Sequence, residues 1–408
     1  QSMPIVDTIL ALKFKELTME FNYIIDTFFA LFAMTLIIFM VPGFAMLEAG
    51  LVRTKNVTSV LTVNVMIYAI ASLAFLLIGY ELAFGSWDHQ DGMSKWAFFM
   101  FQMAFVGKVV NIMSGGVSER SRILPLAIFT LLVGAFIYPI IVNLTWGANF
   151  LSGTALDISS LSDLAGSTVI HSTGGWALLA AILIMGPRRG RYKDNIVRVI
   201  PASNIPLVTL GALLLWIGWF GFNGGSVGSI SSKENADAVA LTIMNTNTAG
   251  LTGAIAGWLL TYFRYKKFDI TVILNGALGG LVAVTAGPDQ YDIYTPILIG
   301  AIGGALVVLF VPIFDKLRMD DPVGALSVHL INGIWGTLAV GIFVADVSIW
   351  TQLKGILVVG IIVFPLSWVT IYIINKIFVL RANDEEQLEG IDATECGIES
   401  YPEFKRSI

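Results

Sequence analysis

The sequence predicts an all-α protein that crosses a membrane many times. Hydrophobic residues make up 56% of its 408 residues, charged residues only 13%, and the mean hydropathy is +0.79, as is typical of membrane-embedded chains. The apolar runs are continuous rather than alternating, which favours helices over a transmembrane barrel. One motif that occurs in both halves of the chain indicates an internal repeat.

Eleven runs are long enough to cross about 30 Å of hydrocarbon, which takes about 20 apolar residues in a helix. They lie near residues 24–50, 57–81, 96–118, 122–143, 163–186, 203–226, 237–263, 269–287, 293–314, 322–345 and 350–380. The chain therefore divides into an extracytoplasmic N-terminal segment (1–22), a membrane domain (23–380) and a cytoplasmic C-terminal tail (381–408). We expect a multi-pass protein of the inner or plasma membrane.

The basic residues predict the orientation, because cytoplasmic loops of membrane proteins are enriched in Lys and Arg. They gather in alternate loops, at Arg53/Lys55, Arg120/Arg122, 188–198, 264–267, Lys316/Arg318 and Lys376/Arg381. These loops are predicted to be cytoplasmic, with the N-terminus outside and the C-terminus inside. Because the basic residues serve topology, the net charge of -5 implies no nucleic-acid partner.

The repeated motif opens the fifth and tenth predicted helices. It reads Asp163-x-x-Gly166-x-x-x-x-His171-x-x-x-Gly175 and Asp321-x-x-Gly324-x-x-x-x-His329-x-x-x-Gly333. The two helices enter from opposite sides of the membrane, so the motif predicts a five-plus-five inverted repeat, about 23–200 and 201–346, with one extra helix at 350–380.

Each motif histidine follows its aspartate by eight residues, or about 12 Å of helix, which places both imidazoles near the membrane midplane. Ionisable side chains at that depth usually line a pathway. Two neutral imidazoles in contact could share a proton and orient a small solute. The alternative is that His171 and His329 each bond a neighbouring helix. The third histidine, His89, falls in a predicted outer loop.

Aromatic side chains are expected near the outer membrane surface, together with one hydroxyl. They are Phe101, Phe105, Trp146, Phe222 and Ser226. Ring faces attract a small cation by about 0.5–2 kcal/mol each, and a hydroxyl accepts hydrogen bonds; an ordinary interfacial aromatic belt is the alternative. Asp163 has two interpretations as well, an N-cap of its helix or a support for a cation site.

The sequence contains no pattern typical of an enzyme, a metal site or a cofactor site, since the two histidines supply too few ligands.

Several long stretches resemble the Amt/Mep/Rh ammonium transport family, in its Amt branch, over nearly the whole chain. They are residues 42–50 (PGFAMLEAG), 101–105 (FQMAF), 118–120 (SER), 163–171 (DLAGSTVIH), 218–223 (GWFGFN), 245–248 (NTNT) and 320–322 (DDP). The resemblance implies a homotrimer with one pathway per subunit and no enzymatic activity.

The resemblance also implies roles for the residues already described. The outer ammonium site would comprise Trp146, Phe105 and Ser226, supported by Asp163, and methylammonium would serve as an analogue. Phe101, Phe105 and Phe222 would form the gate, and the twin histidines would line the pore. Ammonium would lose its proton at the gate and cross as ammonia.

Three polar residues depart from the family pattern and are possible pore modifiers, namely Lys108, Asn111 and Asn332. A charged Lys108 facing the pore would repel ammonium; alternatively it turns toward a buried partner. Cys396 stands in the tail where a histidine is usual. These departures keep a second function open, an ammonium sensor with little conduction that signals through the tail to a histidine kinase or similar module. A PII-type regulator at the cytoplasmic face is expected from the family.

Overall fold

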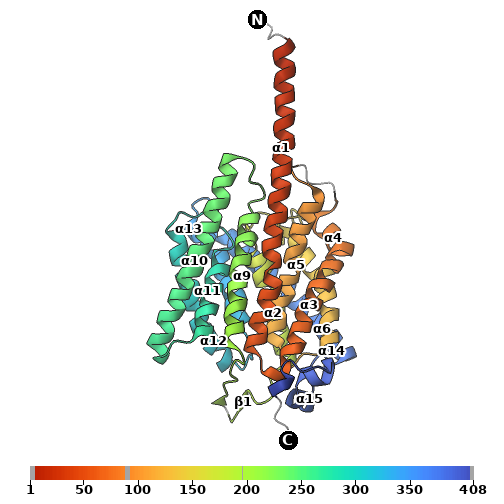
Figure 1. Cartoon of the computed structure of the whole chain (residues 1–408), viewed down its shortest axis with the longest axis vertical. Helices are drawn as coiled ribbons and strands as arrows, with labels where there is room; N and C mark the ends of the chain where they lie inside the picture. Colours follow the sequence, from red (N-terminus) through yellow and green to blue (C-terminus); the bar gives the residue numbers. More distant parts are fainter. Residues whose placement is uncertain (1–4, 88–91, 195, 405–408) are drawn as a thin grey trace.

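The computed structural model describes residues 5–87, 92–194 and 196–404, and shows an elongated bundle of helices (Figure 1). Nine helices in this part of the chain are long and apolar enough to cross a membrane. The predicted fold class, an all-α multi-pass membrane protein, is thereby confirmed. Residues 1–4, at the start of the predicted N-terminal segment, and 405–408, at the end of the tail, lie outside the described residues, as does His89.

The first half of the chain contains, among the described residues, five of the helical segments that could cross a membrane, and three of them include one wider π-helical turn. The elements are α1 (Ile5–Ile38), α2 (Met40–Leu51), η1 (Thr54–Asn56), α3 (Val57–Ala74), η2 (Phe75–Gly79), α4 (Tyr80–Phe84), α5 (Lys95–Val117), α6 (Ile123–Leu132), η3 (Val133–Ile137), α7 (Tyr138–Thr145), η4 (Ser167–Ser172) and α8 (Thr173–Met185). A short hairpin of β1 (Tyr192–Lys193) and β2 (Ile196–Val197) follows.

The second half continues with longer helices and ends in a folded tail. The elements are α9 (Ile205–Gly225), α10 (Lys233–Tyr265), α11 (Ile270–Val284), α12 (Thr295–Lys316), η5 (Leu326–Ile331), α13 (Asn332–Phe343), α14 (Ile349–Phe378), α15 (Asp384–Glu389), η6 (Asp392–Cys396) and η7 (Pro402–Phe404).

All eleven predicted runs overlap helices. Two of them, α10 and α11, are not among the nine clear spans. The 15 residues of α11 are short for a crossing, and α10 carries charged residues at both ends and polar ones at its centre. A total of eleven crossings therefore stays a prediction.

Two boundaries differ from the predicted ones. The first helix begins at Ile5 rather than near residue 24, and its N-terminal part rises alone beyond the bundle (Figure 1). It breaks at Phe39, where Pro42 lacks the amide that would continue the hydrogen-bond ladder. The run predicted from 163 becomes helical only at Ser167, because Asp163 folds back as a cap.

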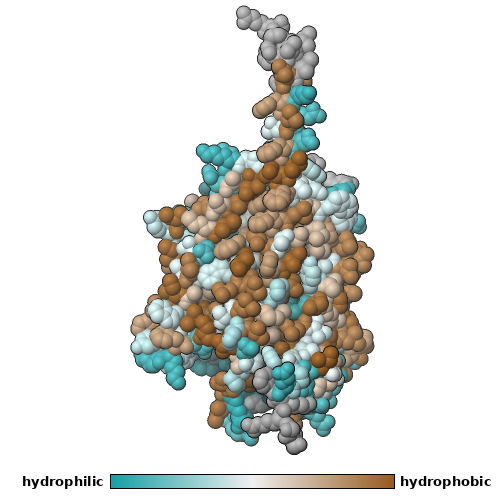
Figure 2. Space-filling model, in the orientation of Figure 1, coloured by the Kyte–Doolittle hydropathy of each residue, from teal (hydrophilic) through white to brown (hydrophobic). Residues whose placement is uncertain are grey.

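The chain ends lie at opposite ends of the long axis (Figure 1), as an odd number of crossings requires. We call the end from which α1 projects the outer end, following the predicted orientation. Figure 2 shows a broad apolar belt over the bundle, with hydrophilic side chains gathered at both ends. This is the surface expected of a protein embedded in lipid.

Glycines permit the closest helix contacts in the second half, as their high number predicts. A Cβ added at Gly253 of α10 would lie 2.3 Å from the carbonyl oxygen of Gly276 on α11. One added at Gly304 of α12 would lie 2.2 Å from the carbonyl oxygen of Gly253. Three helices therefore meet backbone to backbone here, and two of them, α11 and α12, contact η5 of the repeated motif.

Candidate functional site

The two motif histidines meet in the centre of the bundle. His171 lies on η4 and His329 on η5, and their Nδ1 atoms are 3.2 Å apart. The rings are nearly parallel, with centroids 5.2 Å apart and an interplanar angle of 19°. Both side chains are buried. One Nδ1 must carry a proton and the other must accept it, so the pair shares a hydrogen bond across the repeat.

The motif aspartates cap the turns that carry the histidines. The carboxylate of Asp163 accepts hydrogen bonds from four backbone amides, those of Gly166, Ser167, Thr168 and Val169. Asp321 accepts three, from Val323, Gly324 and Leu326. Asp163 therefore satisfies the free amides at the start of its helix, as the capping interpretation predicts, although the residue at the N-cap position itself is Gly166. A role in a cation site stays a prediction.

The local structure explains why each motif position requires glycine. Gly166 and Gly324 adopt φ values of +105° and +80°, a region that favours glycine. Gly175 and Gly333 lie where the two motifs cross. A Cβ on Gly175 would approach the backbone nitrogen of Leu330 to 2.9 Å, and one on Gly333 would approach the carbonyl oxygen of Ser167 to 2.4 Å. The motif therefore encodes a close crossing of η4 with η5.

A column of aromatic rings leads from the outer end to the histidines. The ring centroids of Phe101 and Phe105 on α5 are 4.9 Å apart, and those of Phe105 and Phe222 on α9 are 4.7 Å apart. His171 then stacks on Phe222 at 5.4 Å and on Trp219 at 5.2 Å. The three phenylalanines predicted as a gate thus lie together, directly above the histidine pair.

An outer cup of about 470 Å³ opens above this column. Its lining includes Phe101, Phe105, Trp146 and Ser226 but not Phe222, so four of the five side chains expected near the outer surface line one cavity. The hydroxyl of Ser226 donates to the carbonyl oxygen of Phe222 at 2.7 Å, so its oxygen lone pairs stay available as acceptors. Ring faces and one acceptor are the features that suit a small cation.

The position of Trp146 depends on Asp163. The indole Nε1 donates to the backbone carbonyl of Asp163 at 2.8 Å. Asp163 does not line the cup, and its carboxylate points into the capped turn. It supports the cup indirectly, by holding both the histidine-bearing turn and the tryptophan.

Asp26 is part of the cup wall that sequence reasoning missed. This buried residue of α1 lines the cavity. Its carboxylate accepts from the backbone amides of Ile230 and Ser231, at 2.7 and 3.0 Å, and from the Ser231 hydroxyl at 2.7 Å. It thereby fixes the loop that follows Ser226. An acidic residue early in an apolar run was the only available signal.

The amino-acid sequence matches the family model described as Ammonium Transporter Family over residues 28–401. The chain belongs to this family. An ammonium transporter, Amt2, of Archaeoglobus fulgidus is 33% identical over 419 residues, which cover 93% of this chain and 89% of the relative. The ammonium transporter of Bacillus subtilis is 32% identical over 416 residues, with 92% and 98% covered.

Solved structures agree with this assignment. A structure titled Sensor Amt Protein superimposes with a TM-score of 0.85 at 30% identity, covering 92% of this chain and 99% of that one. Mep2 of Saccharomyces cerevisiae superimposes with a TM-score of 0.79 at 26% identity, with 90% and 91% covered. The chain is accordingly a multi-pass plasma-membrane protein of the ammonium transporter family.

Against this family background, the three possible pore modifiers lie in different surroundings. Lys108 on α5 is 1% exposed, and its Nζ has no hydrogen-bond partner among the described residues. It follows Phe105 by one helical turn, on the same side of the helix. Asn111 donates to Asn64 at 2.7 Å. Asn332 donates to the carbonyl oxygen of Ser327 at 3.0 Å, and its amide lies against glycines of α11 and α12.

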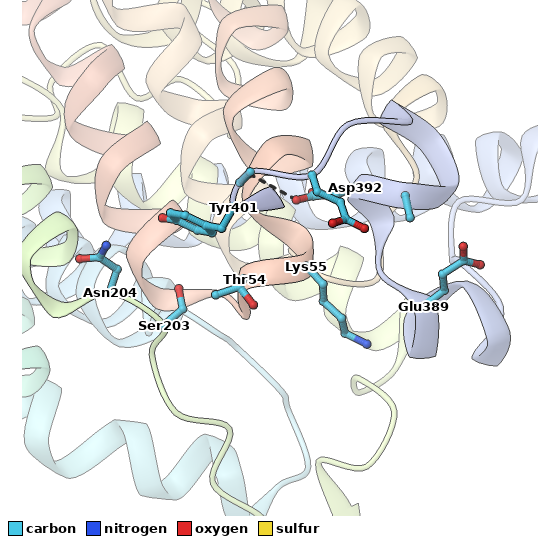
Figure 3. Close-up of a pocket in the computed structure, with 10 residues that line it drawn as sticks. Thr54, Lys55, Ser203, Asn204, Glu389, Asp392 and Tyr401 are labelled. Atoms are coloured by element: carbon cyan, nitrogen blue, oxygen red, sulfur yellow. Dashed lines mark hydrogen bonds between the residues drawn. The ribbon is translucent and has the colours of Figure 1, made fainter. Parts of the chain in front are cut away.

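The C-terminal tail is docked by specific contacts rather than by diffuse charge. Asp392 accepts from the amides of Thr58 and Ser59 at the start of α3, at 2.9 and 2.7 Å. The Nζ of Lys55 donates to the carbonyl oxygens of Gln387 and Leu388. A hollow of about 400 Å³ remains between the tail and the membrane body (Figure 3).

Figure 3 shows how the hollow is built, with Thr54 and Lys55 on one wall and Glu389, Asp392 and Tyr401 of the tail on another. It lies at the opposite end of the molecule from the outer cup, near α15 (Figure 1). Within the described residues, no three His, Cys, Asp or Glu side chains are grouped to hold a metal ion.

Proposed function

We propose that this protein recognises ammonium in the outer cup and transports it across the membrane. The observation that carries the proposal is the continuous arrangement of cup, aromatic column and histidine pair. Trp146, Phe105 and Ser226 would hold the cation, with methylammonium as an analogue. Phe101, Phe105 and Phe222 would close the way beneath it.

The apolar column favours passage of neutral ammonia over the intact ion. Moving a charge through an apolar constriction costs several kcal/mol, whereas a neutral solute needs only hydrogen-bonding partners. Ammonium would therefore release its proton above Phe222, and ammonia would pass His171 and His329. Potassium has no proton to release, so the same column would exclude it.

The finer architecture belongs to the same proposal. Eleven crossings in a five-plus-five inverted repeat would account for the matched capped turns on η4 and η5. The N-terminus would lie outside and the tail inside, because the basic loops surround the tail. A homotrimer would carry one pathway in each subunit. The domain limits would be 1–22, 23–380 and 381–408.

One observation favours a second function, an ammonium sensor with little or no conduction. The buried amine of Lys108 follows the gate, and a charged amine there would repel ammonium. The solved relative of similar fold titled Sensor Amt Protein makes this alternative concrete. The docked tail would then pass the signal to a fused module, such as a histidine kinase, or to a PII-type regulator.

Ammonium-evoked current in proteoliposomes tests the proposal and separates the two functions. We expect a wild-type current that saturates with ammonium and is absent with potassium. Lys108→Ala should change it, whereas Lys233→Ala, an exposed lysine at the start of α10, should not. Current only after removal of Lys108 favours the sensor. No ammonium response in any variant, by current or binding, contradicts both functions.

A further inference from the structure

The part of α1 that projects beyond the bundle carries an apolar stripe that stays exposed (Figure 1). Residues 10 and 12–21 of this helix are all exposed. The stripe begins among them and continues along the part of α1 that packs on the bundle. It comprises Leu10, Phe14, Leu17, Phe21, Ile24, Phe28 and Leu31. The exposed fractions of these side chains range from 38% at Leu31 to 75% at Phe14.

The spacing of this stripe is that of a coiled-coil seam. Its successive intervals are 4, 3, 4, 3, 4 and 3 residues, which is the heptad repeat with apolar residues at positions a and d. Aliphatic residues take the d positions and phenylalanines the a positions, namely Leu10, Leu17, Ile24 and Leu31 at d and Phe14, Phe21 and Phe28 at a. A repeat of this kind keeps one side of the helix facing a helical partner.

The bundle occupies the opposite side of α1. Asp26, Ala30 and Ala33 are buried there, and Asp26 bonds to the loop at Ser231. Each of the three follows a residue of the stripe by two positions, and two positions are about 200° apart around a helix. The stripe is therefore directed away from the protein's own bundle, in its lower half as well as in its projecting half.

Lipid does not account for the stripe in the projecting part. Lys13, Lys15, Glu16 and Glu20 are all exposed there, and charged side chains at this density exclude a helical stretch from hydrocarbon. The projecting part therefore lies in water, where a continuous apolar stripe is unfavourable and marks an interaction surface. A lone helix of this length is also only marginally stable in water, so a partner would stabilise it.

A second copy of this chain is the partner that fits. A heptad seam is covered by the seam of another helix, and all copies inserted alike in one membrane carry α1 at the same height and in the same direction. The stripes of two copies are thus parallel and in register. In this register, residues at g meet residues at e of the next copy, which pairs Lys13 with Thr18 and Glu20 with Ile25. Like charges do not meet.

We propose that the projecting part of α1 forms a parallel, in-register coiled coil with the α1 helices of other copies of this chain, outside the membrane. The contact continues through Ile24 and Phe28 onto the flank of the bundle, so it also determines how neighbouring subunits are turned toward one another. This inference goes beyond the proposed function, and its test requires neither ammonium nor conduction.

Disulfide cross-linking of the purified full-length protein in proteoliposomes tests the proposal. Single cysteines replace Leu17, at d, or Met19, on the opposite side of the helix, with Cys396→Ala in both. The two side chains are similarly exposed, at 57% and 64%. A disulfide needs Cα atoms about 4.4–6.8 Å apart, which equivalent seam positions approach and outward positions do not. We expect a linked band of twice 44.2 kDa for Leu17→Cys alone. No band for Leu17→Cys, or an equal band for Met19→Cys, overturns the proposal.

A pair of double variants shows whether the seam itself makes the contact. A reporter cysteine, Leu10→Cys, is combined with Phe14→Ser and Leu17→Ser, or with Leu12→Ser and Met19→Ser as the matched control on the opposite side. All four positions are exposed, so the bundle keeps its fold in both. The linked band should be lost in the seam variant and retained in the control. Linkage that survives the seam variant, or is lost equally in both, contradicts a coiled coil through this stripe.

Discussion

Asp163 and Asp321 occupy equivalent positions in the two motifs. Comparing their variants therefore distinguishes a structural role from a role in ammonium binding. Both residues cap their own turns through backbone amides, with Asp163 buried and Asp321 partly buried. Only Asp163 also holds Trp146, through its carbonyl oxygen. The two residues therefore share one structural task and differ in their distance from the outer cup.

We predict that Asp163→Asn and Asp321→Asn each lower the free energy of unfolding by about 1–3 kcal/mol, because buried amides lose a charged acceptor. Only Asp163→Asn should also weaken ammonium binding in the cup, by about tenfold. Thermal unfolding measures the change in stability. A titration of the Trp146 fluorescence with ammonium measures the change in affinity. Equal loss of ammonium affinity in both variants would show that Asp163 is a cap and nothing more.

The sequence correctly predicted those residue contacts that follow from the spacing of residues along a helix. The eight-residue separation from a capping aspartate places each histidine at a comparable depth, so the contact of His171 with His329 was predictable. The burial of Glu48 was not, because Glu48 resembles a carboxylate at a helix end in the sequence, and only the packing of α2 against α5 buries it. Asp26 was missed for the same reason, since its partners lie about 200 residues away.

The π-helical turns η4 and η5 carry the two histidines and bring them into contact with each other. Such turns widen the helix locally and are frequent at functional sites. The sequence predicted helices here from continuous apolar runs, which measure length but not winding. For the same reason the run from 163 was predicted four residues too long at its start, and the long N-terminal extension of α1 was not expected.

The contact between the C-terminal tail and α3 predicts which residue anchors the tail. Asp392 caps α3 from a distance of more than 300 residues, so Asp392→Ala should cost about 1 kcal/mol of stability and release the tail. Limited proteolysis should cleave the tail faster in this variant. Glu385→Ala, an exposed change on α15, should leave the rate unchanged. Equal cleavage of wild type and Asp392→Ala would contradict the proposed anchor.

A buried group of charges at the end of the molecule opposite the outer cup joins the two halves of the chain. Arg188, after α8, pairs with Asp320, before η5, at 2.8 Å and with Glu119, after α5, at 3.1 Å. Arg53 also pairs with Glu119, at 2.8 Å. The side chains of Arg188, Asp320 and Glu119 are at most 4% exposed. Loops of both halves therefore depend on one another at this point.

This group predicts how the stability of the molecule depends on pH. Burial alone would raise the pKa of Asp320, but the hydrogen bonds from Arg188 and the charge of Arg120 hold it well below its usual range. Burial would likewise raise the pKa of Glu119, but the charge of Arg188 and the hydrogen bonds and charge of Arg53 outweigh burial and hold that pKa below its ordinary value. Both carboxylates are thus more acidic when folded, so their contribution is complete above pH of about 4 and is lost as pH falls further.

Asp320→Asn should therefore be less stable than wild type by about 3–5 kcal/mol near pH 7, because it leaves buried Arg188 without its main partner. The difference should shrink as pH falls below about 4, since protonation of Asp320 in the wild type removes the same charge. Thermal unfolding across pH measures both, with Glu234→Gln as an exposed control. A difference that stays constant down to pH of about 2 would mean that Asp320 acts through shape rather than charge, and that the two halves are held together elsewhere.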